Sequence, residues 1–211
     1  MSAGLRLVVA TTNPNKLREI RGILNGTGAI VEGLDAFPSV AEPEETGATF
    51  EENARQKAVY YSTTLGVTVV AEDSGLEIDG LGGEPGVQSA RYGGPAADTY
   101  PQKFAIVYAG LRAKNAMGSP ARFVCALAVA SGASILFEAR GTVEGRVHDE
   151  PKGAGGFGYD PIFFFPPLGR TLAELDEQEK AAVSHRGRAF RALAAFLREG
   201  GLRALPASES R

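Results

Sequence analysis

The chain has 211 residues, 44% of them apolar and 22% charged, a composition that indicates one globular domain or two small lobes and excludes disordered and fibrous proteins. Its formal net charge is −3, so we expect no nucleic-acid partner. The single cysteine, Cys125, excludes an intramolecular disulfide and a cysteine-rich zinc site.

Neither a membrane span nor an export signal is predicted. The apolar stretch at residues 123–137 is uncharged but contains Ser131 and Gly132, and it is shorter than the roughly 20 apolar residues that cross a bilayer. Only residues 7–10 form an apolar run before Thr11, which is too short for the core of a signal peptide. We therefore expect a cytoplasmic protein.

The expected elements alternate between strands and helices early in the chain, and strands gather in its middle. Asn13 can cap a helix that begins at Pro14, and Thr49 with Glu52 forms a capping box for a second helix. In chain order we expect a strand at 5–10, a helix from 14 that stops at Gly26, a helix from 49 to near Gly66, a strand at 68–71 that 75–78 continue or pair with, a helix at about 99–111, strands at 121–130, 134–139 and 142–147, a strand at 162–165, a capping box at 171–174 and a helix at about 184–198.

This order of elements predicts an α/β fold with a mixed central sheet flanked by helices, and two lobes around a substrate cleft. No long linker or internal repeat interrupts the chain, so residues 1–203 are expected to form a single domain. Residues 204–211 are expected to be a frayed tail.

A first candidate site is the turn at residues 11–16 (TTNPNK), between a strand and a capped helix. A helix start offers free N–H groups, and Lys16 lies one turn further, where its ammonium can reach an oxyanion. The sequence lacks the glycines of a Walker A loop. A solvated lysine on an ordinary capped helix explains the same spacing equally well.

Two adjacent carboxylates, Glu72 and Asp73, form a second candidate at the end of a buried strand. Successive strand residues point to opposite faces, so one of the two faces a ligand, where it could hold Mg²⁺ or accept a proton from water. An acidic turn is the alternative. Asp73-Ser-Gly also resembles half of an aspartic protease site, but that enzyme needs two such aspartates and the triplet occurs once.

The glycine-rich loop at residues 153–158 (GAGGFG) is a third candidate. It matches the dinucleotide-binding spacing but has neither the strand before it nor the helix after it that this function requires. Phe157 and Tyr159 beside Asp160 suit a flat ligand, because aromatic rings stack on nucleobases and a carboxylate accepts their N–H groups. A tight turn before the strand at 162–165 is the alternative.

The C-terminal segment from Lys180 to Arg203 carries six lysines or arginines and one acid, Glu199. His185 within it could act as a base, a phosphate donor or a base-recognition group, although a solvated helix face explains most of the charge. Acidic, basic and aromatic groups together suit a magnesium–triphosphate ligand. The residues by themselves therefore indicate a nucleotide-handling enzyme without identifying the reaction.

Seven motifs along most of the chain resemble the inosine/xanthosine triphosphate pyrophosphatases, in the order of that family. They are Thr11-x-Asn-x-x-Lys16, Glu45-Thr-Gly-Ala-Thr-Phe-x-Glu-Asn53, Asp73-Ser-Gly-Leu, Leu81-Gly-Gly-x-Pro-Gly86, Ser89-Ala-Arg-Tyr92, Gly155-Gly-Phe-Gly-Tyr-Asp-Pro-Ile-Phe163 and Ser184-His-Arg-Gly187. Thr12 stands where the family often has glycine, and Glu72 where many bacterial relatives have aspartate.

The resemblance implies Mg²⁺-dependent hydrolysis of (d)ITP and XTP to the monophosphate and pyrophosphate by a homodimer, for which residues 163–165 (FFF) are a candidate apolar surface. It implies Asp73 as the base, with Lys16 and Lys57 as its catalytic partners, and Asp73 with Glu44 as metal ligands. Glu45 competes with Glu44 for that place. The implied substrate-binding residues are Thr11, Thr12, Asn13, Pro14, Asn15, Lys16, Ser74, Phe157, Gly158, Tyr159, Asp160, Lys180, His185 and Arg186.

Two other functions remain open from the sequence. One is a pyrophosphatase of similar fold that prefers other modified nucleotides. The other is a nucleotide sensor that binds triphosphates without turnover, although a pure binder needs no positioned base such as Asp73.

Overall fold

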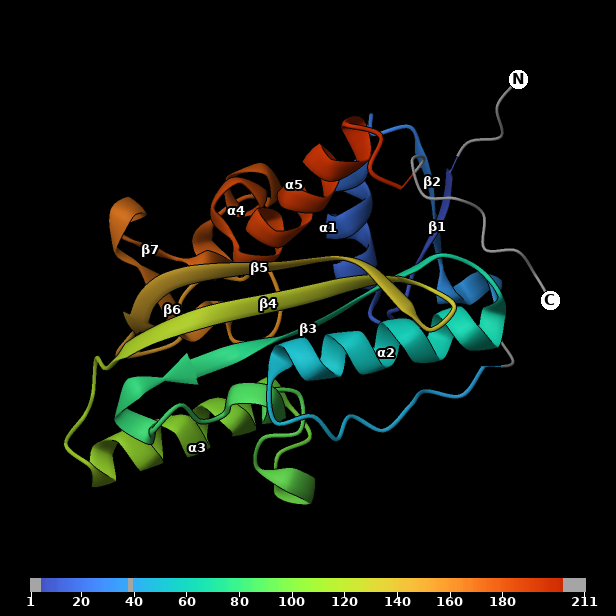
Figure 1. Ribbon diagram of the computed structural model, residues 1–211. Helices are drawn as coiled ribbons and strands as arrows, with labels where there is room; N and C mark the ends of the chain where they lie inside the picture. The colour runs from blue at the N-terminus through green and yellow to red at the C-terminus, as the bar shows by residue number, and fades with distance from the viewer. Residues whose placement is uncertain (1–4, 38–39, 203–211) are drawn as a thin grey trace. The chain divides into compact units, whose positions relative to one another are not determined.

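The computed structural model describes residues 5–37 and 40–202, so the tail expected at 204–211 lies outside the described residues. None of the described helices combines the length and the apolar character needed to cross a membrane. The strands and helices are β1 (Leu5–Val9), α1 (Pro14–Leu24), β2 (Ala29–Gly33), α2 (Phe50–Leu65), β3 (Val69–Ile78), α3 (Tyr100–Ala113), β4 (Pro120–Ser131), β5 (Ser134–Val147), β6 (Phe163–Phe165), β7 (Arg170–Thr171), α4 (Glu177–Val183) and α5 (His185–Arg198) (Figure 1).

The seven strands form one sheet in the order β2-β1-β3-β4-β5-β6-β7. Strand β1 pairs in parallel with β2 and β3, whereas β6 pairs antiparallel with β5 and β7. Parallel neighbours need crossover connections, and α1 and α2 lie in the segments that link the three parallel strands. The predicted α/β class with a mixed sheet is therefore confirmed.

The chain divides into two compact units. Unit 1 contains the described residues up to Asp73, residues 126–140 and the described residues from Gly187 onward. Within it, α2 and α5 lie on opposite sides of the strands (Figure 1). Unit 2 contains residues 74–125 and 141–186. The expectation of a single domain over residues 1–203 stays a prediction.

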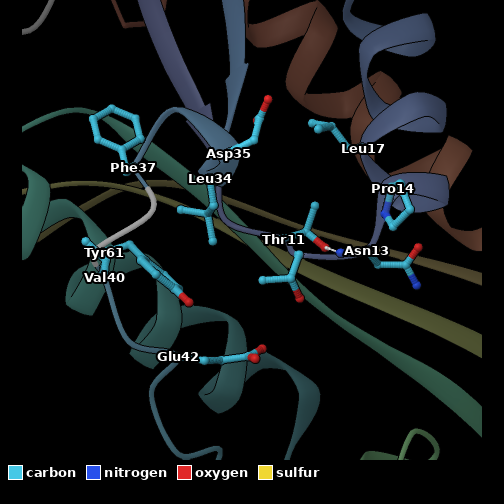
Figure 2. Close-up of a pocket in the computed structure, with 11 residues that line it drawn as sticks. Thr11, Asn13, Pro14, Leu17, Leu34, Asp35, Phe37, Val40, Glu42 and Tyr61 are labelled. Carbon is cyan, nitrogen blue, oxygen red and sulfur yellow. Dashed lines mark hydrogen bonds between the residues drawn. The ribbon is translucent and has the colours of Figure 1, made fainter.

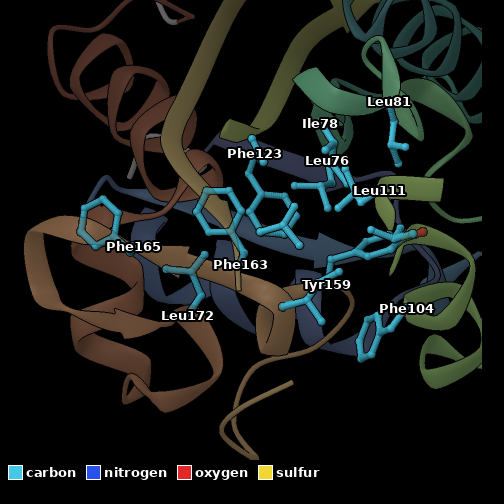
Figure 3. Close-up of a cluster of buried hydrophobic side chains, with 14 of the residues drawn as sticks. Leu76, Ile78, Leu81, Phe104, Leu111, Phe123, Tyr159, Phe163, Phe165 and Leu172 are labelled. Carbon is cyan, nitrogen blue, oxygen red and sulfur yellow. The ribbon is translucent and has the colours of Figure 1, made fainter. Parts of the chain in front are cut away.

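The core of unit 2 combines aliphatic and aromatic side chains (Figure 3). The rings of Phe123 and Phe163 have their centroids 4.7 Å apart, and both side chains are buried. Phe165 is also buried, because alternate residues of β6 point to the same face, while Phe164 between them is half-buried. The interpretation of residues 163–165 as an apolar surface for a dimer was therefore wrong for Phe163 and Phe165.

Three findings differ from the expected elements. Strand β2 was not predicted, and α4 begins at its own capping box, Asp176 with Glu179, rather than at residues 171–174, which open a single 3₁₀ turn. Strand β5 continues through Gly141, where two strands were expected. Strand β3 runs unbroken through residues 69–78, so residues 75–78 continue it, which is one of the two arrangements expected. Pairing with neighbouring strands keeps both of these backbones extended.

The predicted capping box of α2 forms, and we expect it to contribute measurably to stability. The Thr49 Oγ1 accepts the Glu52 N–H at 3.2 Å, and the Glu52 Oε2 accepts the Thr49 N–H at 3.3 Å. Thr49→Ala should lower the free energy of unfolding by about 1 kcal/mol, because a helix N–H loses its acceptor. Urea denaturation measures this, with Thr64→Ala near the C-terminal end of α2 as the control; an equal loss in both variants would contradict the cap's role.

Candidate functional site

The turn from β1 into α1 is ordered by its own side chains. The Asn13 Oδ1 accepts the backbone N–H groups of Asn15 at 2.9 Å and Lys16 at 3.3 Å, and the Thr11 Oγ1 accepts the N–H of Asn13 at 3.2 Å. The predicted cap at Asn13 and the helix start at Pro14 are confirmed. Since Asn13 already occupies two N–H groups, the Lys16 ammonium is the main positive group that this turn offers to an anion.

A cavity of about 510 Å³ lies beside this turn in unit 1 (Figure 2). Asp35 and Glu42 contribute carboxylates to a lining that otherwise consists of apolar and uncharged polar side chains. The lining residues are Thr11, Thr12, Asn13, Pro14, Leu17, Leu34, Asp35, Phe37, Val40, Glu42 and Tyr61. Among these described residues there is no lysine or arginine, so the cavity does not suit a triphosphate.

A buried cluster of charged side chains surrounds Asp73, which lies in the middle of β3 and not at the end of a buried strand as expected. The Asn53 Nδ2 donates to the Asp73 Oδ2 at 2.9 Å. The Lys57 Nζ, from the same face of α2, lies 3.7 Å from the Asp73 Oδ1 and 2.5 Å from the Glu45 Oε1. Asn53 and Lys57 are four residues apart, which places both on one side of the helix. The second helix therefore supplies two groups that hold Asp73 in place.

Lys16 and Glu72 form a second ion pair in unit 1. The Lys16 Nζ lies 2.7 Å from the Glu72 Oε1, and the Glu72 side chain is almost completely buried. The predicted catalytic residues Lys16, Lys57 and Asp73 are thus each engaged with an oppositely charged partner. This arrangement excludes the reading of Lys16 as a merely solvated side chain.

Burial and neighbouring charges shift the pKa values of Asp73 and Lys57 at the centre of the cluster. Burial raises the pKa of Asp73, the Lys57 ammonium and the Asn53 hydrogen bond lower it, and the net shift is upward with added repulsion from Glu45 and Glu72. Burial lowers the pKa of Lys57, but Asp73 and Glu45 outweigh it and the net shift is again upward. Lys57 therefore keeps its positive charge among the carboxylates.

The two competing metal-ligand candidates occupy different environments. Glu44 is exposed, whereas the Glu45 carboxylate contacts Lys57 and adds negative charge near Asp73. Within residues 5–37 and 40–202, no group of three or more histidine, cysteine, aspartate or glutamate side chains is arranged to hold a metal ion. The resemblance implied Glu44 as the first candidate and Glu45 as the second, and Glu45 is the one that lies in the buried cluster.

In unit 2 the glycine loop brings an aromatic ring next to a buried ion pair. The Lys180 Nζ lies 2.7 Å from the Asp160 Oδ2 and 4.3 Å from the centroid of the Phe157 ring. The same Asp160 oxygen accepts the backbone N–H of Phe157 at 2.8 Å. Phe157 is half-buried, while Asp160 and Lys180 are buried. Lys180 and the Phe157 ring thus form a cation–π pair, and Asp160 holds both residues in place.

Ser74 and Arg186 meet within unit 2. The Arg186 Nη2 donates to the Ser74 Oγ at 3.0 Å, and the guanidinium carbon lies 5.5 Å from the Phe157 ring centroid. The His185 ring stacks on Phe123 with centroids 4.7 Å apart and an interplanar angle of 10°. Most of the substrate-binding residues expected in unit 2 therefore lie close to Phe157 or to one another.

The surroundings of Tyr159 and Gly158 fit a role in shaping the loop. The Tyr159 side chain is 3% exposed, its hydroxyl donates to the Ser89 carbonyl at 3.0 Å, and its ring packs edge-on against Tyr100. Gly158 has a φ of +68°.

Two residues contact the candidate site that were not among the predicted site residues, Asn53 and Phe123. Asn53 lies in one of the motifs that carry the family resemblance, but the contact of Phe123 with His185 has no signal in the sequence.

Gly156 is expected to tolerate no side chain, because its φ is +67° and an added Cβ would collide with the Asp160 carboxylate. We expect Gly156→Ala to displace Asp160 and raise the KM for nucleotide at least about tenfold, the equivalent of about 1.4 kcal/mol. Steady-state kinetics measure this. Gly169→Ala, at a similar φ of +63° but with open space around it, is the control for backbone strain; an unchanged KM in Gly156→Ala would contradict the loop's role.

Comparisons with known proteins cover nearly the whole chain. The model of the Ham1 family matches residues 7–196. A dITP/XTP pyrophosphatase from an Exiguobacterium strain is 46% identical over 191 residues, which are 90% of this chain and 96% of that protein. A dITP/XTP pyrophosphatase from Thermus thermophilus is 45% identical over 204 residues, which are 95% of each chain.

Solved structures agree with these similarities. A HAM1 protein from Coxiella burnetii superposes with a TM-score of 0.86 at 40% identity, covering 92% of this chain and 99% of the other. The Ham1 protein of Staphylococcus aureus superposes with a TM-score of 0.81 at 37% identity and covers 92% of this chain and 98% of the other.

Proposed function

The chain belongs to the Ham1 family, and on that basis we propose that it hydrolyses the purine nucleoside triphosphates (d)ITP and XTP to the monophosphate and pyrophosphate. The dITP/XTP pyrophosphatases that it resembles share 44–46% identity with it over most of their length. The structural observation that supports the proposal is the buried Asp73, held by Asn53 and surrounded by Lys57 and Glu45. Clearance of damaged purines from the nucleotide pool is the role that follows.

We propose Mg²⁺ as the cofactor, with Asp73 and Glu45 as its ligands in preference to Glu44. The residues fit such an ion, because Mg²⁺ prefers carboxylate oxygens and because repulsion from Glu45 and Glu72 adds to the burial that raises the pKa of Asp73. A divalent cation would relieve that repulsion. When bound, it would neutralise phosphate charge and polarise the phosphorus centre that water attacks.

We assign the protein's part of the reaction to four side chains of unit 1: Asp73, Asn53, Lys16 and Lys57. Asp73 accepts the proton of the water that attacks the α-phosphorus, and the Asn53 amide holds the Asp73 Oδ2 so that the carboxylate cannot rotate. Lys16 and Lys57 donate to phosphate oxygens and offset the charge that moves onto the leaving pyrophosphate. The upward pKa shift of Lys57 suits this role, because it keeps the ammonium protonated.

Base recognition is assigned to unit 2. We propose that Phe157 stacks on the purine and that Lys180, His185 and Arg186 supply donors for the oxygen at position 6 of the base. Adenine carries an amino group there, so each buried donor left unpaired would cost about 1–3 kcal/mol. Asp160 holds Lys180 in place for this contact.

The homodimer, the cytoplasmic location and the substrate cleft between two lobes stay predictions. A pyrophosphatase for other modified nucleotides remains the nearest alternative, since it would use the same phosphate chemistry.

Pyrophosphate release from dITP, measured with Mg²⁺ and again with excess EDTA, tests the function. We expect many turnovers per enzyme with Mg²⁺ and none with EDTA. Binding of dITP without release in either condition would identify a nucleotide sensor instead. Continued release in EDTA would contradict the assignment of a divalent cation to Asp73 and Glu45.

A further inference from the structure

Both lysines assigned to the phosphates are held by carboxylates of the same unit. Lys57 contacts Glu45, and the Lys16 Nζ lies 2.7 Å from the Glu72 Oε1. The two pairs differ in the surroundings of the acid: the side chain of Glu72 is 2% exposed and that of Glu45 17%. Glu72 is therefore the carboxylate for which loss of its lysine would leave the more deeply buried charge.

A phosphate that binds Lys16 meets an ammonium already paired with Glu72, and the negative charges of phosphate and Glu72 repel each other there. Separating a buried carboxylate from its lysine gives up their attraction in a low-dielectric environment, which is unfavourable. Glu72 also adds its negative charge to the surroundings of Asp73 and Lys57. A cation held by the acidic cluster would offset the charge of Glu72 and make the release of Lys16 less costly.

We propose that Glu72 occupies the phosphate position on Lys16 and thereby makes phosphate binding depend on the divalent cation. In the absence of that cation, Glu72 retains Lys16 and phosphate binds weakly. In its presence, Lys16 is released and phosphate binds tightly. The inference rests on the proposed function, and it gives Glu72 a role separate from that of the base, Asp73.

Calorimetric titration with inorganic pyrophosphate in EDTA tests this without any turnover. Glu72→Gln keeps the shape of the side chain but removes its charge, so it should bind pyrophosphate about tenfold more tightly than the wild type in EDTA, equivalent to about 1.4 kcal/mol. Glu72→Asp retains a carboxylate and should bind as weakly as the wild type. The double variant Glu72→Gln/Lys16→Met should bind pyrophosphate no more tightly than Lys16→Met alone, because the ammonium that Glu72 retains is absent from both.

Glu42→Gln is the matched control for net charge. Glu42 is an exposed carboxylate that lines the cavity beside residues 11–14, and it contacts neither Lys16 nor Lys57 through a described ion pair. An equal gain in Glu42→Gln would reduce the effect to general electrostatics and overturn the proposal.

The remaining outcomes separate this inference from the function on which it rests. If the wild type binds pyrophosphate with Mg²⁺ but Glu72→Gln binds it no more tightly than the wild type in EDTA, the role of Glu72 is overturned and the proposed function stands. If the wild type neither binds pyrophosphate with Mg²⁺ nor releases it from dITP, both are overturned. Circular dichroism of each variant confirms that it is folded before its affinity is compared.

Discussion

Asp73→Asn is expected to lower kcat for dITP by about 10²–10⁴-fold, the contribution that a positioned general base makes. The amide keeps the size of the side chain and can still accept the hydrogen bond from Asn53, so the fold should persist. It cannot take a proton from the attacking water, and it is a weaker ligand for a divalent cation. Single-turnover measurement of pyrophosphate release determines the loss.

Asp98→Asn is the control for this substitution. Asp98 is an exposed carboxylate in unit 2, remote in sequence from every residue assigned to the site. Its variant should retain the wild-type kcat. A loss below about tenfold in Asp73→Asn would contradict the assignment of Asp73 as the base, and urea denaturation of both variants excludes unfolding as the cause.

Asp160→Ala is expected to lower the free energy of unfolding by about 3–5 kcal/mol, because removing one partner of a buried ion pair is strongly destabilising. Asp160 and Lys180 are both almost completely buried, and the Asp160 Oδ2 accepts a hydrogen bond from the Phe157 N–H as well as from Lys180. Urea denaturation measures the effect.

The double variant Asp160→Ala/Lys180→Met separates the ion pair from simple packing. Removing the second charge should recover a large part of the stability lost in the single variant, since the buried ammonium that Asp160 contacts is removed as well. The KM for dITP should stay high in both, because neither retains the Lys180 contact in its native position. A single-variant loss below about 1 kcal/mol would contradict a buried, coupled pair.

The elements that short-range chemistry specifies could be predicted from the sequence. Asn13 followed by Pro14 determines the start of α1, and Thr49 with Glu52 determines the start of α2, because a cap involves only neighbours in the chain. Asp73 lies in the middle of β3 and not at the end of a buried strand as expected, because pairing with neighbouring strands extends β3 to Ile78. The caps place the starts of α1 and α2, the helices that carry Lys16 and Lys57, at the correct residues.

What depends on partners distant in sequence could not be predicted. Strand β2 carries the exposed Ile30 and the acidic Glu32, and its extended backbone comes from pairing with β1 rather than from any apolar alternation of its own. The pairing of Glu45 with Lys57, which distinguishes it from Glu44, arises from a segment that folds back along α2. The inward direction of Phe163 likewise depends on its place in the sheet.

Release of pyrophosphate from dITP, XTP, dATP and dGTP, compared side by side with Mg²⁺, tests the central claim most directly. We expect rapid release from dITP and XTP and little from dATP, with the release from dITP lost in Asp73→Asn; dGTP carries the same oxygen at position 6, so its rate measures how far the amino group at position 2 lowers turnover. Comparable rates on dITP and dATP would contradict recognition of the base oxygen and favour a pyrophosphatase of broader specificity. No release from any of the four would contradict the proposed function itself.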